Sequence, residues 1–199
     1  MTKAIVFDIG GVLIDLDLQR CIQAFKEIMG FDRITELLDP CHQKGIYGDL
    51  EEGTLPAGEF RTMVIKESRP GCKREDVDHC MSLLLDGIRQ ETAQAVKSVY
   101  GRYPLYLLSN NNPISMPFCL NALDEAGIGG MFQDKFVSFE MKMLKPSAGF
   151  YREVVRRIGM DPSEILFIDD SPANIEGAKA VGMDARLLKA GQPLKDLLP

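Results

Sequence analysis

Residues 4–11 read Ala-Ile-Val-Phe-Asp-Ile-Gly-Gly, an apolar run that ends in a carboxylate and is followed by two glycines. Four consecutive apolar residues are typical of a strand that is buried on both faces of a parallel sheet. Asp8 stands where such a strand would end. Because a buried carboxylate needs a hydrogen bond, a charged partner or a metal ion, Asp8 either forms the next turn or is a functional acid, and this stretch alone leaves both open.

The length and composition limit the number of domains and the kinds of partner that the protein can have. With 199 residues, of which 45% are hydrophobic and 26% charged, the chain suffices for one large globular domain, or for one domain with a smaller one inserted. The net charge of −6 argues against nucleic acid as a partner, and no stretch is long enough to span a membrane. We expect a monomer or a weak dimer, although the sequence does not set the oligomeric state.

The cysteine and histidine content points to a cytoplasmic protein without zinc. The five cysteines are odd in number, scattered along the chain, and contain no C-x-x-C pair. This usage is typical of reduced thiols in the cytoplasm. Only two histidines are present, and neither lies at a metal-binding spacing, which argues against a zinc site.

Two regions of the chain differ in their hydrophobic pattern. In residues 16–87 the apolar residues recur at helical spacing between glycine and proline breaks, which predicts four or five short helices and no strand. From residue 88 onward helices and strands alternate. We expect helices over 88–100, 113–126, 147–158 and 172–181, and strands over 105–108, 136–138, 165–168 and 185–188.

This alternation predicts an α/β fold, a Rossmann-like doubly wound parallel sheet with helices on both faces. Residues 1–15 and 88–199 would form this catalytic core. Residues 16–87 would be a small helical-bundle cap inserted after the first strand. Because ligands of such sheets bind beyond the carboxyl ends of the strands, the cap would cover the binding edge.

Three of the expected strands end in polar residues, namely Asp8, Ser109-Asn110 and Asp169-Asp170. These ends meet at one edge of a parallel sheet, and three carboxylates crowded together there would repel one another. A divalent cation with oxygen ligands relieves that repulsion, and Mg²⁺ suits such a site. We therefore expect Asp8, Asp170 and the carbonyl of Gly10 to be Mg²⁺ ligands, with Asp169 either a further ligand or a support for the others.

Two more features bear on this edge. Ser171-Pro172 already provides a helix start, so two preceding acids exceed what capping requires. Lys145 precedes Pro146 and is therefore expected in extended backbone before the 147–158 helix, from where it can reach the carboxylates. Taken alone, Lys145 could be an ordinary solvated lysine. Its charge, however, would help to offset the three acids.

These residues resemble the haloacid dehalogenase superfamily. Its four motifs are matched in order by Phe-Asp-Ile-Gly-Gly-Val at 7–12, Leu-Leu-Ser-Asn at 107–110, Met-Leu-Lys-Pro at 143–146 and Phe-Ile-Asp-Asp at 167–170. The similarity covers essentially the whole chain, including a helical cap of the C1 type. The Asp-Asp-x-x-x-Asn-Ile-Glu-Gly-Ala run at 169–178 is similar to that of the sugar-phosphate phosphatases, in particular the bacterial α-glucose-1-phosphate phosphatases.

The resemblance implies a Mg²⁺-dependent phosphatase that acts on small phosphorylated metabolites. Asp8 would attack phosphorus and form an aspartyl phosphate, which water then hydrolyses. Ser109 and Asn110 would bind the phosphoryl group, and Lys145 would neutralise its charge. Asp170 would hold Mg²⁺. Sugar phosphates are the expected substrate class.

One position departs from the family pattern. Most of these phosphatases carry a second Asp, the general acid and base, two residues after the nucleophile, where this chain has Gly10. The loss argues against a mutase and favours sugar 1-phosphates, whose hemiacetal leaving group needs less protonation than an ordinary alcohol. Equal turnover of primary-alcohol phosphates would contradict that preference. Asp15 or Asp17 could instead donate the proton, although a hinge or helix-start role suits each of them.

Two other activities and the cap residues remain to be weighed. A dehalogenase would use the same ester chemistry on carbon, but it needs no Mg²⁺, and the Asp169-Asp170 pair argues against it. A binding or regulatory protein with a degenerate site is suggested by Gly10.

In the cap, the candidates for substrate selection are His42, Tyr47 and the segment 49–52. The alternative is that Tyr47 is a packed aromatic and the segment a solvated loop.

Overall fold

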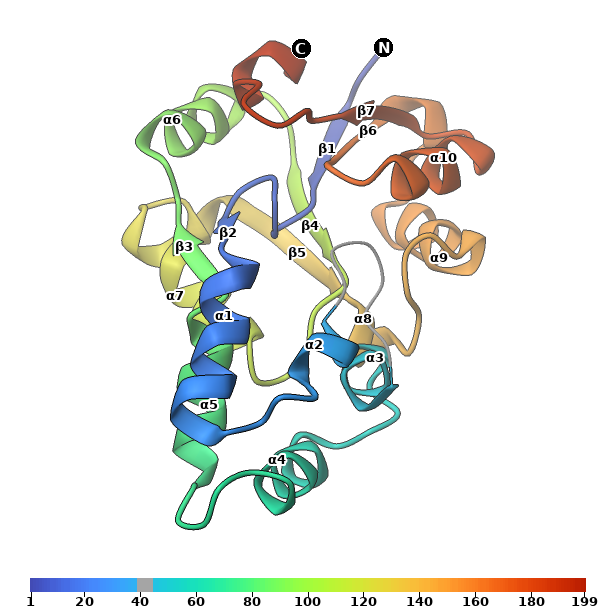
Figure 1. The fold of residues 1–199 in the computed structure, drawn as a ribbon. Helices are drawn as coiled ribbons and strands as arrows, with labels where there is room; N and C mark the ends of the chain where they lie inside the picture. Colours follow the sequence, from blue (N-terminus) through green and yellow to red (C-terminus); the bar gives the residue numbers. More distant parts are fainter. Residues whose placement is uncertain (39–44) are drawn as a thin grey trace.

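The computed structural model describes residues 1–38 and 45–199. Its central feature is a parallel sheet of five strands in the order β5-β4-β1-β6-β7 (Figure 1). The strands are β1 (Ala4–Phe7), β4 (Leu105–Ser109), β5 (Phe132–Val137), β6 (Ile165–Asp169) and β7 (Asp184–Leu187). The first strand lies in the middle, between two strands from the second half of the chain. This topology confirms the predicted doubly wound α/β fold.

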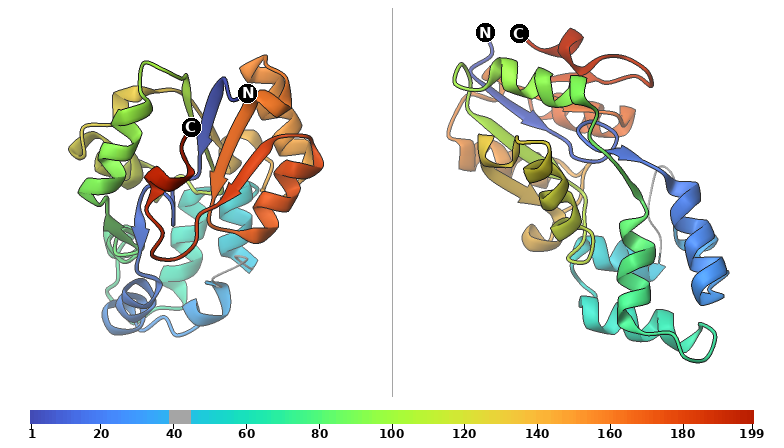
Figure 2. Two further views of the ribbon diagram at one scale, coloured as in Figure 1. Left: turned by 90° about the horizontal axis from the view of Figure 1, so that it is seen from above. Right: turned by 90° about the vertical axis from the view of Figure 1, so that its left-hand side faces the viewer.

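Helices cover both faces of the sheet (Figure 2). They are α6 (Gln90–Val99) and α7 (Met116–Glu125) on one face, and α9 (Ala148–Ile158) and α10 (Pro172–Ala180) on the other. Side chains along a strand alternate between the faces, so Ile5 and Phe7 pack with α6 and α7 while Ala4 and Val6 pack with α9 and α10. Burial on both faces explains why β1 is apolar throughout.

The residues between β1 and α6 form a helical insertion with a hydrophobic core of its own. Its described helices are α1 (Leu18–Ala24), η1 (Phe25–Met29), α2 (Ile34–Leu37), α3 (Gly45–Glu52), α4 (Ala57–Lys66) and α5 (Arg74–Ser82). Phe25, Phe60 and Val77 are buried in that second core. The division at residues 16 and 87 stays a prediction, and the separate core supports it.

Two short strands join the insertion to the sheet. β2 (Asp15–Leu16) pairs antiparallel with β3 (Leu85–Gly87) at the point where the chain leaves the core and returns to it (Figure 1). The expectation that residues 16–87 contain no strand was therefore wrong. A strand of two or three residues shows no hydrophobic period, and this one pairs with residues about 70 positions away, so nothing local marks it.

The remaining elements are short, and the expected boundaries shift by a few residues. They are η2 (Gly129–Met131), α8 (Ser138–Met141), η3 (Pro162–Glu164) and η4 (Leu194–Leu197). Both termini lie at the end of the sheet far from the insertion (Figure 1). The four described cysteines carry free thiols. No helix in residues 1–38 or 45–199 has the length and apolarity that crossing a membrane requires.

Candidate active site

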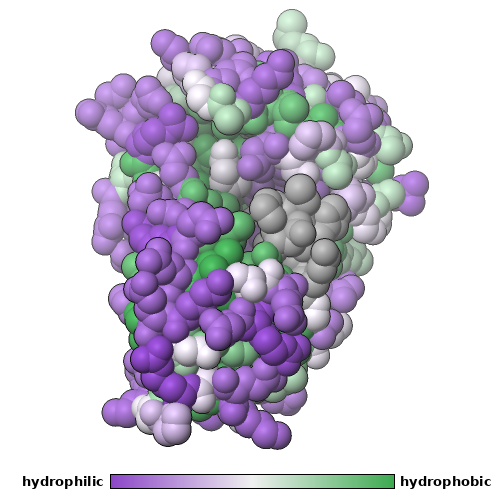
Figure 3. All heavy atoms as spheres, viewed as in Figure 1, coloured by the Kyte–Doolittle hydropathy of each residue, from purple (hydrophilic) through white to green (hydrophobic). Residues whose placement is uncertain are grey.

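A cavity of about 350 Å³ lies at the carboxyl edge of the sheet, under the helical insertion. Its lining includes six of the sequence-predicted site residues: Asp8, Gly10, Ser109, Asn110, Lys145 and Asp170. In Figure 3, apolar side chains gather in the middle of the face, between the sheet and the insertion. The lining of the cavity also includes Leu16, Leu84 and Leu85. One face of the cavity is thus polar and charged, and another is apolar.

Asp8 follows β1 directly and is buried. Its Oδ1 accepts a hydrogen bond from the backbone N–H of Ile9 at 2.7 Å and lies 2.9 Å from the Nζ of Lys145. Burial raises the pKa of Asp8, the Lys145 charge opposes that rise, and the Asp169 carboxylate adds to it. Asp8 is therefore a carboxylate that gains from any further positive charge in the cavity.

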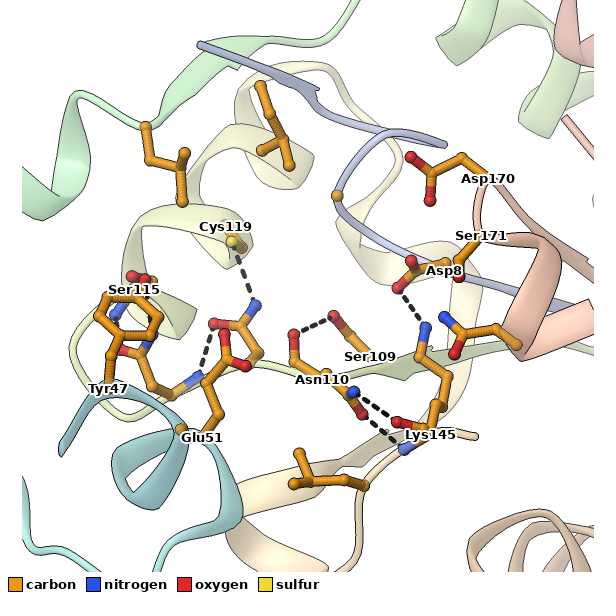
Figure 4. A pocket seen from close by; sticks show the side chains of 18 of the residues that line it. Asp8, Tyr47, Glu51, Ser109, Asn110, Ser115, Cys119, Lys145, Asp170 and Ser171 are labelled. Atoms are coloured by element: carbon orange, nitrogen blue, oxygen red, sulfur yellow. Dashed lines mark hydrogen bonds and ion pairs between the residues drawn. The ribbon is translucent and has the colours of Figure 1, made fainter. Parts of the chain in front are cut away.

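Lys145 is the positive centre of the site, and its side chain is only 1% exposed. Its Nζ reaches Asp8 (Figure 4). It also lies 2.7 Å from Asp169 Oδ2 and donates a hydrogen bond to the Leu108 carbonyl at 3.1 Å. Burial lowers the pKa of Lys145, but the two carboxylates outweigh that effect and the pKa is raised. Lys145 is therefore charged, and the solvated-lysine alternative does not describe it.

The backbone of Lys145 is fixed by Asn110. The Asn110 side chain accepts a hydrogen bond from the Lys145 N–H at 2.8 Å and donates one to the Lys145 carbonyl at 3.0 Å. This double contact joins the end of β4 to the segment before α9. Ser109 lies beside it with its hydroxyl 3.2 Å from the Asn110 carbonyl, to which it donates (Figure 4).

Asp169 is fully buried behind the cavity. The hydrogen bonds that its carboxylate accepts come from residues of the site. Its carboxylate accepts from the Ser171 N–H at 2.8 Å, from the Asn174 amide at 3.0 Å and from Lys145. Both oxygens are therefore occupied, which favours a supporting role over direct metal ligation. Ser171 is the N-cap residue of α10 and Pro172 its first residue, as expected, but the Ser171 side chain makes no capping hydrogen bond.

Asp170 is the exposed member of the pair and lines the cavity. Burial and the neighbouring Asp169 raise its pKa. Gly11 allows the loop after β1 to pass directly against it, because a Cβ on Gly11 would overlap the Asp170 carboxylate. The φ of +77° at Gly11 also favours glycine.

The oxygen atoms at this edge fit a small divalent cation. One carboxylate oxygen from each of Asp8, Asp169 and Asp170 lies within 4.8 Å of the others. Three acids against the single charge of Lys145 leave an excess of negative charge. Hard oxygen donors and uncompensated carboxylates are the surroundings that Mg²⁺ prefers.

The far end of the cavity is formed by α3 of the insertion and by the loop before α7. Asn112 closes that loop by accepting hydrogen bonds from the N–H groups of Ile114 and Ser115 at 3.0 and 2.9 Å. Tyr47 and Glu51 enter from α3 (Figure 4). The interpretation of this segment as solvated loop was wrong for Glu51, whereas Tyr47 is both packed and part of the lining. His42 lies outside the described residues.

Asp15 and Asp17 both have structural partners. Asp15 Oδ2 lies 2.9 Å from the Nε of Arg89 across the β2–β3 junction. Asp17 caps α1 by accepting a hydrogen bond from the Arg20 N–H at 2.9 Å. Neither residue lines the cavity, so their positions agree with the hinge and helix-start roles.

Sequence reasoning missed two supporting residues. Asn174 lies one helical turn into α10 and holds Asp169, and Ser138 accepts a hydrogen bond from the Asn111 N–H at 3.0 Å. For Asn174 the signal was present in the 169–178 run. For Ser138 no local signal exists, since its partners come from another strand end and from the insertion.

Comparison with known proteins places the chain in a family. Residues 2–182 match the family model described as haloacid dehalogenase-like hydrolase. A D-ribitol-5-phosphate phosphatase of Bacteroides thetaiotaomicron is 32% identical over 92% of this chain and 90% of its own length. Fructose-1-phosphate phosphatase of Escherichia coli is 22% identical over 91% of this chain and 93% of its own.

A solved structure is similar over the full length of both chains. It is a haloacid dehalogenase family enzyme of Bacteroides thetaiotaomicron in complex with magnesium and inorganic phosphate, 30% identical, with a TM-score of 0.88 and full coverage of each chain. The family expected from the four motifs is confirmed: the chain belongs to the haloacid dehalogenase-like hydrolases.

Proposed function

We propose that this hydrolase is a magnesium-dependent phosphatase that cleaves phosphomonoesters of small metabolites, with sugar phosphates as its substrate class. The observation that carries the proposal is the meeting of Asp8, Lys145 and Asp170 at one cavity. The names of the two relatives, which are phosphatases of sugar or sugar-alcohol phosphates, support it.

In the proposed mechanism a carboxylate oxygen of Asp8 attacks phosphorus in line with the leaving oxygen. The P–O bond to the leaving group breaks and an aspartyl phosphate forms. Lys145 and the Ser109 hydroxyl, with the Asn110 side chain nearby, would bind the phosphoryl oxygens as negative charge spreads over them. Water then attacks phosphorus, the P–O bond to Asp8 breaks, and the carboxylate is restored with release of phosphate.

For the metal we propose Asp8, Asp170 and the carbonyl of Gly10 as ligands, with Asp169 as the support of Lys145. When Mg²⁺ is bound, it supplies the positive charge that the carboxylates lack and polarises the phosphoryl oxygens. The solved relative that contains magnesium and phosphate supports this choice of ion.

The far end of the cavity supports a hydroxyl-bearing leaving group. The Tyr47 hydroxyl lies there, 3.5 Å from the amide nitrogen of Asn112. The Ser115 hydroxyl is buried and has no hydrogen-bond partner among the residues that the structure describes. Such groups suit the hydroxyls of a sugar or polyol. Without a proton donor near the leaving oxygen, the absence of an acid at Gly10 would favour sugar 1-phosphates.

We also propose a binding partner, a cellular location and an oligomeric state for the enzyme. We expect a small phosphorylated metabolite as the binding partner, and we expect no binding to nucleic acid or to a membrane. The acidic charge and free thiols support a cytoplasmic location. A monomer or weak dimer is proposed for the oligomeric state.

The proposal is tested by measuring phosphate release from a panel of sugar, polyol and nucleotide monophosphates with Mg²⁺. We expect turnover of several sugar phosphates, loss of activity with a chelator, and no turnover by Asp8→Asn. Phosphate release that survives the chelator would overturn the magnesium dependence, and release of halide from a haloacid without metal would favour the dehalogenase alternative. Failure of the wild-type protein to release phosphate from any ester would favour a binding or regulatory protein, and equal activity of Asp8→Asn would overturn the nucleophile.

A further inference from the structure

Glu51 is an acid of the insertion that lies in the same cavity as Asp8. It belongs to the last turn of α3 and is partly buried. Figure 4 shows Glu51 and Asp8 on opposite sides of the pocket, with Ser109 and Asn110 between them. A phosphoryl group bound between these side chains would therefore have the nucleophile on one side and Glu51 on the other.

That placement matters because of in-line geometry. The leaving oxygen lies on the side of phosphorus that faces away from the attacking oxygen. With Asp8 at the sheet edge, the leaving oxygen points toward α3. Gly10 offers no acid, and the space beside its Cα is taken by Leu16, whose Cδ1 lies 3.0 Å from where a Cβ would be.

The backbone of Glu51 is held on the core. The Ser138 hydroxyl donates a hydrogen bond to the Glu51 carbonyl at 2.6 Å, and Ser138 is fully buried. The same hydroxyl accepts from the N–H of Asn111, the residue after Asn110. Lys142 also donates to the carbonyl of Gly53, two residues beyond Glu51. Glu51 is thus fixed relative to the phosphoryl-binding residues.

The surroundings of Glu51 favour its protonated form. Burial raises its pKa to about 8, Lys145 acts against that rise and Asp8 adds to it. Tyr47, one turn earlier on α3, is the other described titratable group that interacts with it, and its own pKa is raised by burial and by Glu51. A carboxylic acid that keeps its proton at neutral pH has the state that a general acid requires.

We propose that Glu51 is the catalytic proton donor and acceptor that this chain lacks at Gly10. This inference rests on the proposed phosphatase function. In the first step the P–O bond to the leaving group breaks, and the Glu51 proton moves to the leaving oxygen to give a neutral alcohol. In the second step the Glu51 carboxylate removes a proton from the attacking water, the P–O bond to Asp8 breaks, and phosphate leaves while Glu51 regains its proton.

A consequence concerns the substrates. With a proton donor at the leaving oxygen, esters of ordinary alcohols become substrates, and the reason for restricting the enzyme to sugar 1-phosphates disappears. Esters whose leaving groups are already acidic, such as p-nitrophenyl phosphate, gain little from protonation. The loss of kcat/KM on substitution of Glu51 should therefore be larger for esters with a more basic leaving group.

The test compares Glu51→Gln with the wild type on glycerol phosphate and on p-nitrophenyl phosphate. Gln has the shape of Glu but cannot transfer a proton. We expect kcat/KM of the variant to fall about 10²- to 10⁴-fold on glycerol phosphate and less than about tenfold on p-nitrophenyl phosphate. The wild type should lose kcat/KM at alkaline pH as Glu51 loses its proton, and the variant should not show that decline. Glu52→Gln, which changes the next residue of α3 outside the cavity lining, is the matched control.

The outcomes separate the two proposals. Equal losses on both esters, or no loss on glycerol phosphate, would overturn the role of Glu51 and leave the phosphatase intact. A wild type that hydrolyses sugar phosphates but not glycerol phosphate would also overturn the role of Glu51 alone, whereas a wild type that hydrolyses no ester of the sugar, polyol and nucleotide panel would overturn both proposals. Thermal unfolding of Glu51→Gln within a few degrees of the control confirms that the comparison is between folded proteins.

Discussion

The charge balance of the cavity predicts that Lys145→Met unfolds far more easily than the wild type. Met keeps most of the length of the side chain but removes the one cation that, among residues 1–38 and 45–199, lies within hydrogen-bond reach of Asp8 and Asp169, at 2.9 and 2.7 Å. Removing one partner of a buried ion pair costs about 3–5 kcal/mol because the other charge stays buried without compensation. Here two partners are left, so we expect the upper part of that range.

For a chain of this length each kcal/mol lowers Tm by about 2–4 °C, so a loss of about 4–5 kcal/mol should lower Tm by an amount on the order of 8–20 °C. Differential scanning calorimetry without metal measures it. Saturating Mg²⁺ should reduce the difference, since the ion offsets the same carboxylates. Phosphate release should fall by about 10²-fold or more, as when one stabilising donor is removed from a transition state.

The control is Lys179→Met, which removes an exposed lysine 3.2 Å from Glu176. With side chains 51% and 74% exposed, that pair should contribute less than about 1 kcal/mol. If Lys145→Met unfolds within 2 °C of this control, on the order of the shift that 1 kcal/mol gives, the charge argument is wrong. Should Lys145→Met fail to fold, adding Asp8→Asn removes an opposing charge as well and should restore part of the stability.

Three further expectations follow from the same geometry. Gly11→Ala should lower Tm and Mg²⁺ affinity together, since its Cβ would displace Asp170; an unchanged metal titration would contradict this. Glu51 has a folded-state pKa of about 8 against an ordinary 4.5. Between those pH values the folded protein holds a proton that the unfolded chain has lost. The free energy of unfolding should therefore decline as the pH rises from 4.5 to 8, by up to about 1.4 kcal/mol per pH unit. Urea titrations should show a shallower decline for Glu51→Gln and not for Glu52→Gln. Gly10→Asp added to Glu51→Gln, together with Leu16→Ala to make room for the new side chain, should recover at least about tenfold of the lost glycerol phosphate activity, measured as kcat/KM on folded protein.

The central strands were predictable because they are buried on both faces. β1 and β6 consist of apolar residues up to their polar ends, and such runs need no tertiary information to be recognised. The edge strand β5 was predicted over 136–138 but covers Phe132–Val137. Its first half contains exposed polar residues, Gln133 and Asp134, since an edge strand is partly solvated. Its pattern therefore resembles a loop.

The two acids at the end of β6 were only partly distinguished from sequence, which assigned Asp170 as a metal ligand and left Asp169 as either a further ligand or a support. Asp169 and Asp170 are adjacent, and successive strand residues point in opposite directions. Which of them faces the cavity depends on the register of β6 with β1, where Phe7 lies opposite Ile168. The structure turns Asp169 toward Lys145 and Asn174, and leaves Asp170 at the cavity.

Glu51 was predicted only as one member of the candidate segment 49–52, and the sequence did not single it out from its neighbours. An acid in a short helix is usually solvated, and nothing in the segment 49–52 marks one carboxylate as buried. Most of the residues that line the cavity with Glu51 lie far away in the chain, and so does Ser138, whose hydroxyl donates a hydrogen bond to the Glu51 carbonyl. Contacts of that kind exist only once the insertion has docked on the core.

An acid supplied by the insertion ties the chemistry to the position of α3. The nucleophile, the lysine and the carboxylates that would hold the metal all belong to the core, so they keep their geometry wherever the insertion stands. The proposed proton donor does not. The described contacts that hold α3 on the core include the hydrogen bonds of the Ser138 hydroxyl, the Lys142 ammonium and the Tyr47 hydroxyl, about 0.5–3 kcal/mol each. Ile114 of the core also packs with Tyr47 and Leu50 of α3. The proposed proton transfer to the leaving alcohol therefore requires α3 to be docked as the structure shows it.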